Sequence, residues 1–275
     1  MSADLSVDGA EEVPGAGTFA DAEDHRRVVR ADRLLEGRIF DIVGDTVELS
    51  AGGPTVRREY LVHPGAVAIV ALRGDGAGTD AGGVDAGSGD SGSGDAGSGD
   101  AGSGEPEVLL VTQYRHASRA RLHEIPAGLL DVPGEDPVEA ARRELAEEAD
   151  LRAGTWHVLA DVLLSPGATN ECVRVLLARD LSEVPDAERH VREDEESEMV
   201  ARWVPLADAV EAVLDGRIHN GATTAGLLAA EASRSRGWAG LRPADAPWSL
   251  RRYRSTDGSV DGALTGLPPE HRPAD

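Results

Sequence analysis

The chain has 275 residues, a length that fits one full domain with tails or two small domains. Its formal net charge of −23 argues against nucleic acids and anionic membranes as partners, because both carry negative charge themselves. No apolar run is long enough to imply a membrane-spanning helix, and the single cysteine, Cys172, excludes an internal disulfide and fits a reducing cytoplasm.

The N-terminal part of the chain begins with an acidic stretch and continues into strand-like sequence. Residues 1–24 are rich in small and acidic residues without periodicity, which predicts a disordered tail. They have neither the basic start nor the apolar run of a secretory signal, so we expect a cytoplasmic protein. From residue 28 to residue 72, short apolar clusters alternate with Gly and Pro turn signals, which predicts strands. We expect residues 26–62 to form a strand-rich arm within a domain that covers residues 25–237.

Residues 74–106 are a low-complexity insert. An acidic residue recurs every fifth position among Gly, Ser and Ala, a composition typical of a flexible, self-repelling linker. The acidic spacing does not match an EF-hand loop, which argues against a calcium site. The insert lies between two strand-like runs, Ala66–Leu72 and Val108–Gln113, and neither half of the chain shows a complete core pattern. We therefore interpret it as an overgrown hairpin loop inside one domain, with two separate domains as the alternative.

The elements expected after the insert are strands and helices that intersperse without regular alternation. This order favours an α+β fold or a mixed α/β/α sandwich over a doubly wound parallel sheet. The expected strands are 108–113, 122–125, 156–164, 173–178 and 201–204, and the expected helices are 137–149, 206–214 and 222–233. Residues 238–275 contain Pro, Trp and Arg without a periodic pattern, and we expect a C-terminal tail that packs loosely or not at all.

The helix over residues 137–149 carries a cluster of carboxylates. Asp136 and Pro137 form a strong helix start, since Asp caps and Pro suits the first helical position. Glu144, Glu147 and Glu148 are spaced by three and four positions, which places their side chains next to one another. Enclosed carboxylates repel one another unless cations bind, and Mg²⁺ prefers such oxygen ligands. From this helix alone, a fully solvated acidic face remains the alternative.

The sequence around this helix resembles the Nudix box, which reads Gly-x5-Glu-x7-Arg-Glu-apolar-x-Glu-Glu-x-Gly-apolar. Here Gly128 is followed after six residues by Glu135, and after seven more by the run from Arg143 to Leu151. The chain departs from the pattern in the extra residue between Gly128 and Glu135 and in Asp150, which replaces the Gly at the helix end. Neither departure removes a carboxylate, and Asp tolerates the left-handed conformation that a helix end often needs.

The resemblance implies an α/β/α sandwich around a mixed sheet and an enzyme that uses Mg²⁺ or Mn²⁺ to cleave a pyrophosphate bond. It implies four metal-binding residues: Glu144 and Glu148 directly, Glu147 directly or through water, and Ala127 through its backbone carbonyl. Arg143 would orient these carboxylates, and Glu135 would support the helix.

The surrounding segments resemble one branch of this family, the ADP-ribose pyrophosphatases. The resemblance lies in the lead-in Gln113–His116, in Glu124–Gly128 and in Ser165–Gly167, whose Pro166 follows Asp150 by 16 residues. It implies hydrolysis of ADP-ribose to AMP and ribose 5-phosphate. There are two alternatives. The substrate is another nucleoside diphosphate sugar or a dinucleotide, or the chain is a catalytically inactive Nudix-like binding module.

The same resemblance suggests the residues that contact the substrate. Arg115 would bind the phosphates, because a guanidinium suits bidentate phosphate recognition, and its alternative is a surface Arg at a strand end. Glu124 would contact the adenine side or shape the pocket, and Gly128 would lie against the substrate.

An acidic segment, Arg192–Glu198, follows the last long predicted strand. In this branch such a loop supplies the catalytic base, which makes Glu195 or Glu196 the candidates beside Glu148, with Glu198 third. A solvated loop without a catalytic role is the alternative. Members of the branch are commonly dimers that exchange N-terminal strands, so the resemblance also implies a homodimer built through residues 26–62.

Overall fold

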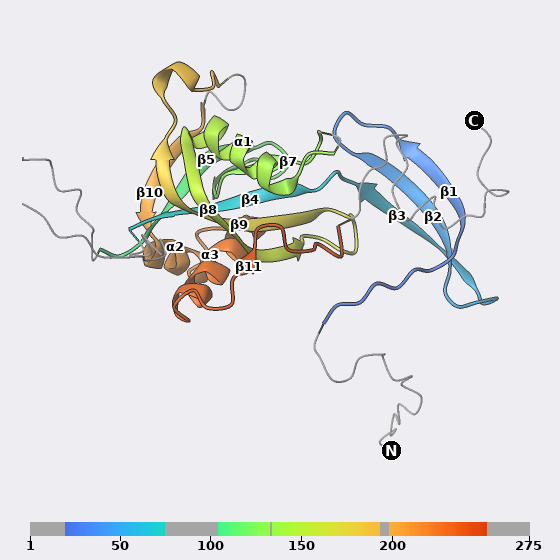
Figure 1. The fold of residues 1–275 in the computed structure, drawn as a ribbon. Helices are drawn as coiled ribbons and strands as arrows, with labels where there is room; N and C mark the ends of the chain where they lie inside the picture. Colours follow the sequence, from blue (N-terminus) through green and yellow to red (C-terminus); the bar gives the residue numbers. More distant parts are fainter. Residues whose placement is uncertain (1–19, 75–103, 133, 193–197, 252–275) are drawn as a thin grey trace, which may run out of the picture.

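The computed structural model of the chain describes residues 20–74, 104–132, 134–192 and 198–251 (Figure 1). The first strands form a separate antiparallel sheet of β1 (Val28–Leu35), β2 (Asp41–Glu48) and β3 (Thr55–Val62), in that order. Figure 1 shows this sheet projecting from one end of a larger body. The expected antiparallel arm is thus confirmed. The expected tail over residues 1–24 lies mostly outside the described residues.

The larger body is built on a mixed sheet in the order β10-β5-β4-β9-β8-β11, with β6 beside β5 and β7 beside β4. Its strands are β4 (Ala66–Arg73), β5 (Glu107–Arg115), β6 (Ala120–Glu124), β7 (Ala127–Leu129), β8 (Leu151–Leu163), β9 (Cys172–Glu183), β10 (Val200–Pro205) and β11 (Arg242–Pro243). The central pair β4 and β9 is parallel, and the other pairs are antiparallel.

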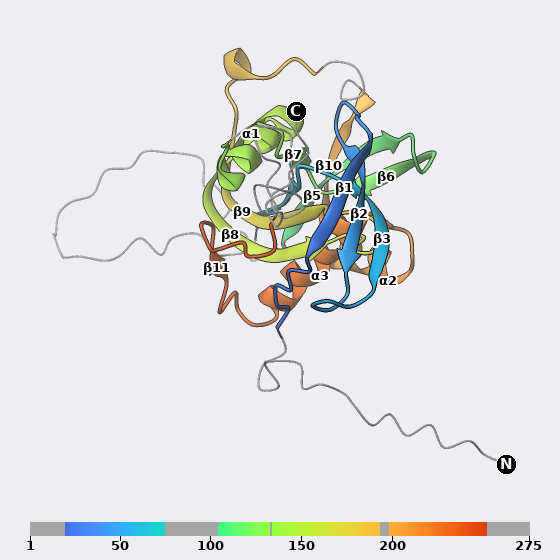
Figure 2. The ribbon, with the colours of Figure 1, turned by 90° about the vertical axis from the view of Figure 1, so that its right-hand side faces the viewer.

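Helices cover both faces of this sheet (Figure 2). Helix α1 (Pro137–Ala149) packs on one face, and α2 (Leu206–Leu214) and α3 (Gly221–Arg234) pack on the other; a short 3₁₀ turn spans Asp186–Glu188. The expected sandwich is confirmed, and α1 and α2 begin and end at the expected residues. No helix in the described part of the chain is long and apolar enough to cross a membrane.

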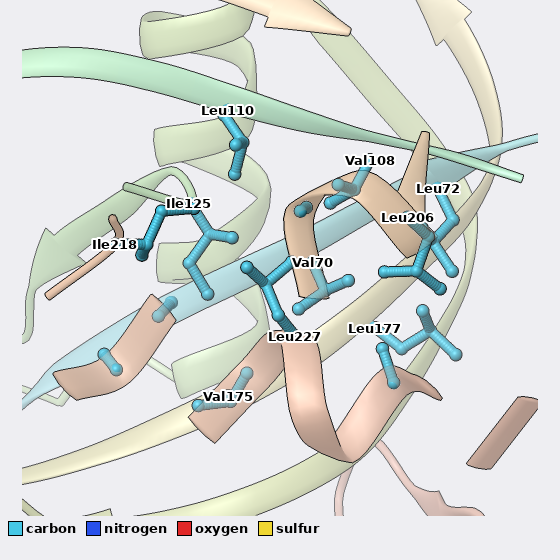
Figure 3. Packing of buried hydrophobic residues seen from close by; sticks show 14 of the residues in the cluster. Val70, Leu72, Val108, Leu110, Ile125, Val175, Leu177, Leu206, Ile218 and Leu227 are labelled. Atoms are coloured by element: carbon cyan, nitrogen blue, oxygen red, sulfur yellow. The ribbon is translucent and has the colours of Figure 1, made fainter. Parts of the chain in front are cut away.

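The position of β4 between two layers of helices explains why its sequence is a continuous apolar run. Its alternate side chains pack on opposite faces, with Ile69 toward α1 and Val70 toward α3. Figure 3 shows Val70 among Val175, Leu177 and Leu227 in the core on the α2 and α3 side of the sheet. A central strand covered on both sides must be apolar at every position, unlike a half-exposed strand.

The flanks of the low-complexity segment lie side by side in the sheet. Leu72 and Arg73 of β4 pair with Val108 and Glu107 of β5, and Arg73 also forms an ion pair with Glu107 at 2.7 Å. This pairing is what the hairpin interpretation requires. Residues 75–103 themselves lie outside the described part.

The expectation of a loosely packed tail from residue 238 onward is wrong for residues 238–251. Trp238 packs against one core, Trp248 against the other, and β11 adds a short strand to the edge of β8. The buried Arg174 donates to the carbonyl oxygens of Ala246 and Pro247 at 2.8 and 3.2 Å. The hydrogen bonds to the buried Arg174 and the packing of the two tryptophans hold this segment in place. Such single contacts produce no periodic pattern in the sequence.

Candidate active site

The carboxylate-bearing helix α1 forms as its sequence predicts. The Asp136 side chain accepts a hydrogen bond from Val138 N at 2.8 Å, and Pro137 occupies the first turn. At the other end Asp150 adopts the left-handed conformation, with φ 55° and ψ 35°, and its N–H donates to Ala146 O at 3.2 Å. Asp150 therefore ends the helix in the conformation for which glycine is the usual residue, at a small conformational cost.

Gly128 lies directly beneath Glu144. A Cβ atom placed on Gly128 would be 1.9 Å from Glu144 Cδ and 2.1 Å from Oε1, far closer than any side chain tolerates. The glycine is thus required for the helix to approach β7 this closely. The short strand β7 is not among the strands expected from the sequence, because three residues containing a glycine give no strand signal.

Glu148 is the buried carboxylate of the group. The residue is only 7% exposed, and its Oε2 accepts a hydrogen bond from Ala127 N at 3.0 Å. Glu144 and Glu148, one helical turn apart, therefore both lie against the backbone of Ala127 and Gly128. The structure brings together four of the residues that sequence analysis singled out, from two segments of the chain.

Arg143 connects the remaining acidic side chains. Its guanidinium donates to Glu144 Oε1 at 2.6 Å and to Glu147 Oε2 at 3.2 Å. It also donates to both oxygens of Glu135 at 3.2 Å, and the hydrogen bond to Glu135 is the main cause that raises the pKa of Arg143 above its usual value. Arg143 is thus a permanent cation that fixes the orientation of three carboxylates.

The donor set fits a hard divalent cation. In the arrangement of the described residues, no group of three or more His, Cys, Asp or Glu side chains converges on one point, and Glu147 is turned to Arg143. Glu144 and Glu148 nevertheless lie on a stretch of backbone without a side chain at Gly128, and carboxylates with a carbonyl oxygen are the ligands that Mg²⁺ and Mn²⁺ prefer.

Arg115 and Glu124 form an ion pair, and Glu124 precedes Ala127 by three residues. Arg115 Nε lies 3.1 and 3.2 Å from the two Glu124 oxygens, and a second guanidinium nitrogen lies 2.6 Å from Oε2. The Glu124 side chain is buried, whereas that of Arg115 is 44% exposed. Because a buried carboxylate needs a partner, Glu124 holds the Arg115 guanidinium at the end of β5, with part of it open to solvent.

The acidic segment is described only at its ends. Glu195 and Glu196 lie outside the described residues. Glu198 is exposed and forms an ion pair with Arg121 of β6 at 2.5 Å. Before the segment, Arg192 donates to Asp150 Oδ2 at 2.6 Å and to Glu147 O at 2.9 Å.

The roles of Arg121 and Arg192 were not expected from the sequence. Arg192 stands directly before an acidic run, but this position does not identify its partner, and no comparable pattern marks Arg121.

Comparison with known proteins supports the resemblance drawn from the motif. Residues 100–225 match the model of the NUDIX domain. The chain is 39% identical over 227 residues to an ADP-ribose pyrophosphatase of Mycobacterium tuberculosis, covering 82% of this chain and 93% of the relative. It is 29% identical over 197 residues to an ADP-ribose pyrophosphatase of Bacillus subtilis, covering 72% and 88% of the two chains.

Among solved structures, the fold is similar to that of a protein described as an ADP compounds hydrolase. The TM-score is 0.55 at 20% sequence identity, and the match covers 79% of this chain and 99% of the other.

Proposed function

Because this chain belongs to the Nudix hydrolase family, we propose that it hydrolyses the diphosphate of ADP-ribose to AMP and ribose 5-phosphate. The observation that carries the proposal is the packing of Glu144 and Glu148 against the backbone of Ala127 and Gly128. Nudix hydrolases generally use divalent metals, and a carboxylate site of this kind would repel a diphosphate unless cations were bound.

Each residue of the site then has a defined task. Glu144 and Glu148 would hold Mg²⁺, or alternatively Mn²⁺, with further oxygens from Glu147 and the Ala127 carbonyl. A metal held there would supply neutralisation of the phosphate charges and a water that is a better nucleophile. Arg143 holds Glu144 in a fixed orientation from outside the site.

Arg115 is proposed to bind a substrate phosphate, held in position by Glu124 at 2.6 Å. This pairing supports a role of Glu124 in shaping the pocket through Arg115. Glu195 or Glu196, with Glu198 as the third candidate, is proposed to take the proton from the attacking water.

The choice of substrate rests on the relatives. Both curated relatives compared above carry the name ADP-ribose pyrophosphatase, and this chain matches them over most of its length. Another nucleoside diphosphate sugar or a dinucleotide would use the same carboxylates with a different pocket. A binding module without catalysis would have no need to keep Glu144, Glu147 and Glu148 together, so their presence favours the enzyme.

We also propose that the protein is a cytoplasmic homodimer that does not bind nucleic acid. Among the described residues, six of the fourteen exposed large hydrophobic side chains lie in the arm between residues 29 and 49. Such a concentration is typical of a surface that meets another protein. The net charge of −23 opposes binding to a polyanion.

The test of the activity is product release from ADP-ribose, ADP-glucose, GDP-mannose, NADH and diadenosine compounds, each with Mg²⁺, with Mn²⁺ and with EDTA. We expect metal-dependent AMP formation with the highest kcat/KM for ADP-ribose. A preference for another compound would keep the family and reject the substrate. ADP-ribose binding without any turnover in the panel would favour the binding module.

A further inference from the structure

The junction between the arm and the main sheet contains a set of hydrogen bonds centred on Asn170. One edge of β3 pairs with β2, and the other faces residues 168–170, with Leu61 and Thr169 as parallel partners. On that edge Leu61 N donates to Ala168 O at 2.9 Å, and Asn170 N donates to Leu61 O at 3.2 Å. The chain before β9 thus pairs with the arm through its backbone.

The Asn170 side chain extends this pairing by one step. Alternate residues of a strand direct their N–H groups to the same edge, so His63 N points the same way as Leu61 N. The carbonyl oxygen of the Asn170 side chain accepts the hydrogen bond from His63 N at 2.8 Å. It therefore substitutes for the backbone carbonyl that a longer strand would have supplied.

The segment held in this way is a tight turn. Ser165 O accepts hydrogen bonds from Ala168 N at 2.9 Å and from Thr169 N at 3.0 Å, which close the turn on itself. Residues 165–168 are exposed. The bonds that Leu61 and His63 make to Ala168 and Asn170 are what tie this turn to the arm.

The turn lies at the same end of the sheet as the carboxylates. Leu129 of β7, Ala66 of β4 and Val173 of β9 are neighbours across three strands. Strand β7, which carries Gly128, is therefore two strand spacings, about 10 Å, from the start of β9. A nucleoside diphosphate sugar with its diphosphate at α1 extends from the phosphates in two directions, and one of its ends can reach this turn.

We propose that Asn170 is a positioning residue for substrate recognition. Its side-chain oxygen fastens the exposed 165–168 turn to the arm through His63 N, so the turn forms a fixed wall for the nucleoside or sugar end of the substrate. The inference rests on the proposed function of the site at α1. Asn170 does not touch the reacting atoms, so its loss weakens substrate binding and leaves the chemical step intact.

The test compares Asn170→Ala, Asn170→Asp and Asn220→Ala in the full chain. Asn220→Ala is the matched control, because the Asn220 side chain also accepts one backbone hydrogen bond, from Thr223 N at 2.9 Å, but at the start of α3. We expect Asn170→Ala to raise KM for ADP-ribose about fivefold, because the turn loses a hydrogen bond that fixes it to the arm, with kcat within about twofold. Asn170→Asp keeps the acceptor oxygen, so its KM should be close to that of the wild type, whereas Asn220→Ala should leave KM unchanged.

Hydrogen exchange of the His63 amide distinguishes a failure of the Asn170 proposal from a failure of the proposed ADP-ribose hydrolysis. The amide of His63 should exchange faster in Asn170→Ala than in the wild type, whether or not the protein hydrolyses ADP-ribose. Absence of turnover in the wild type would reject the proposed function, and the dissociation constant of ADP-ribose would then replace KM in the same comparison. An unchanged KM or dissociation constant in folded Asn170→Ala, or a loss confined to kcat, would overturn the positioning role.

Discussion

Glu148 of the main body and Asp45 of the arm are both almost completely buried carboxylates, yet their surroundings differ. Glu148 Oε2 accepts a backbone hydrogen bond from Ala127 and lies beside a second carboxylate, Glu144. Asp45 Oδ2 accepts a hydrogen bond from the Tyr60 hydroxyl at 3.0 Å, whereas its Oδ1 has no hydrogen-bond partner among the described residues. A buried carboxylate costs free energy, so it needs a reason in each place. In the main body the proposed metal would supply such a reason, whereas the described residues of the arm give Asp45 a hydrogen bond from the Tyr60 hydroxyl alone.

The apolar side chains of the two regions differ in the same sense. The main body buries Ile69, Leu145, Leu177 and Leu227 completely between its layers. The arm leaves Leu34 and Leu35 about half exposed, at 47% and 48%. A three-stranded sheet without covering layers has no core of its own. The main body thus has a buried core of its own, and the exposed apolar side chains of the arm are those that the proposed dimer would cover.

The largest expected effect tests the role of the buried carboxylate in the main body. Glu148→Gln keeps an oxygen that can accept the hydrogen bond from Ala127 N but removes the negative charge. We expect kcat to fall about 100-fold or more, because the charge that holds the metal is lost, while the protein stays folded. Steady-state assays with ADP-ribose and a thermal melt measure both quantities. A near-normal rate would contradict the metal role of Glu148.

The next prediction tests the arm. Leu34→Glu combined with Leu35→Glu places two charges among the exposed apolar side chains of the arm. A leucine buried in an interface contributes about 1.5–3 kcal/mol. We expect the dimer to dissociate at least about 100-fold more readily. Light scattering over a concentration series measures this, with Leu228→Glu on α3 as the control. A wild-type protein that is monomeric at every concentration would reject the proposed dimer.

The sequence was sufficient for the parts of the molecule whose signals are local. The cap at Asp136 and the apolar face through Leu145 predict α1 to the residue, and the spacing of Glu144 and Glu148 predicts a common face. It was insufficient where a partner far along the chain decides the structure. The hydrogen bond from His63 N to the Asn170 side chain, 107 positions away, and the contacts of Arg174 with Ala246 and Pro247 follow from tertiary packing alone.

A smaller effect sharpens the comparison of the two carboxylates. Burial, acting against the Tyr60 hydrogen bond, raises the pKa of Asp45 above the ordinary aspartate value of 3.8. The folded state then binds a proton more readily than the unfolded state, so the ionised Asp45 destabilises the fold above its folded pKa. Asp45→Asn should therefore raise the free energy of unfolding at pH 7.5, because it removes the cost of burying the charged carboxylate.

That gain in the free energy of unfolding should shrink as the pH falls toward 3.8. The wild-type carboxyl is then protonated and, like the amide of the variant, carries no charge. Denaturant melts at pH 7.5 and at pH 4 measure the difference, and activity should stay within about twofold, in contrast to Glu148→Gln. If Asp45→Asn instead lowers the free energy of unfolding at pH 7.5, the Asp45 carboxylate has a stabilising partner, such as a hydrogen-bond donor from the second subunit.

The smallest effect concerns the segment between β4 and β5. Deleting residues 75–103 would leave Gly74, Gly104, Glu105 and Pro106 between the paired residues Arg73 and Glu107. Four residues are a common hairpin loop length, and Gly74 already has the positive φ of 74° that such loops often need. Since the ion pair of Arg73 with Glu107 remains, and a long loop costs little entropy to close, kcat/KM should change less than about twofold. A large loss of turnover in this deletion, with the melting temperature unchanged, would show that the acidic repeat takes part in the function and that the main body is not complete without it.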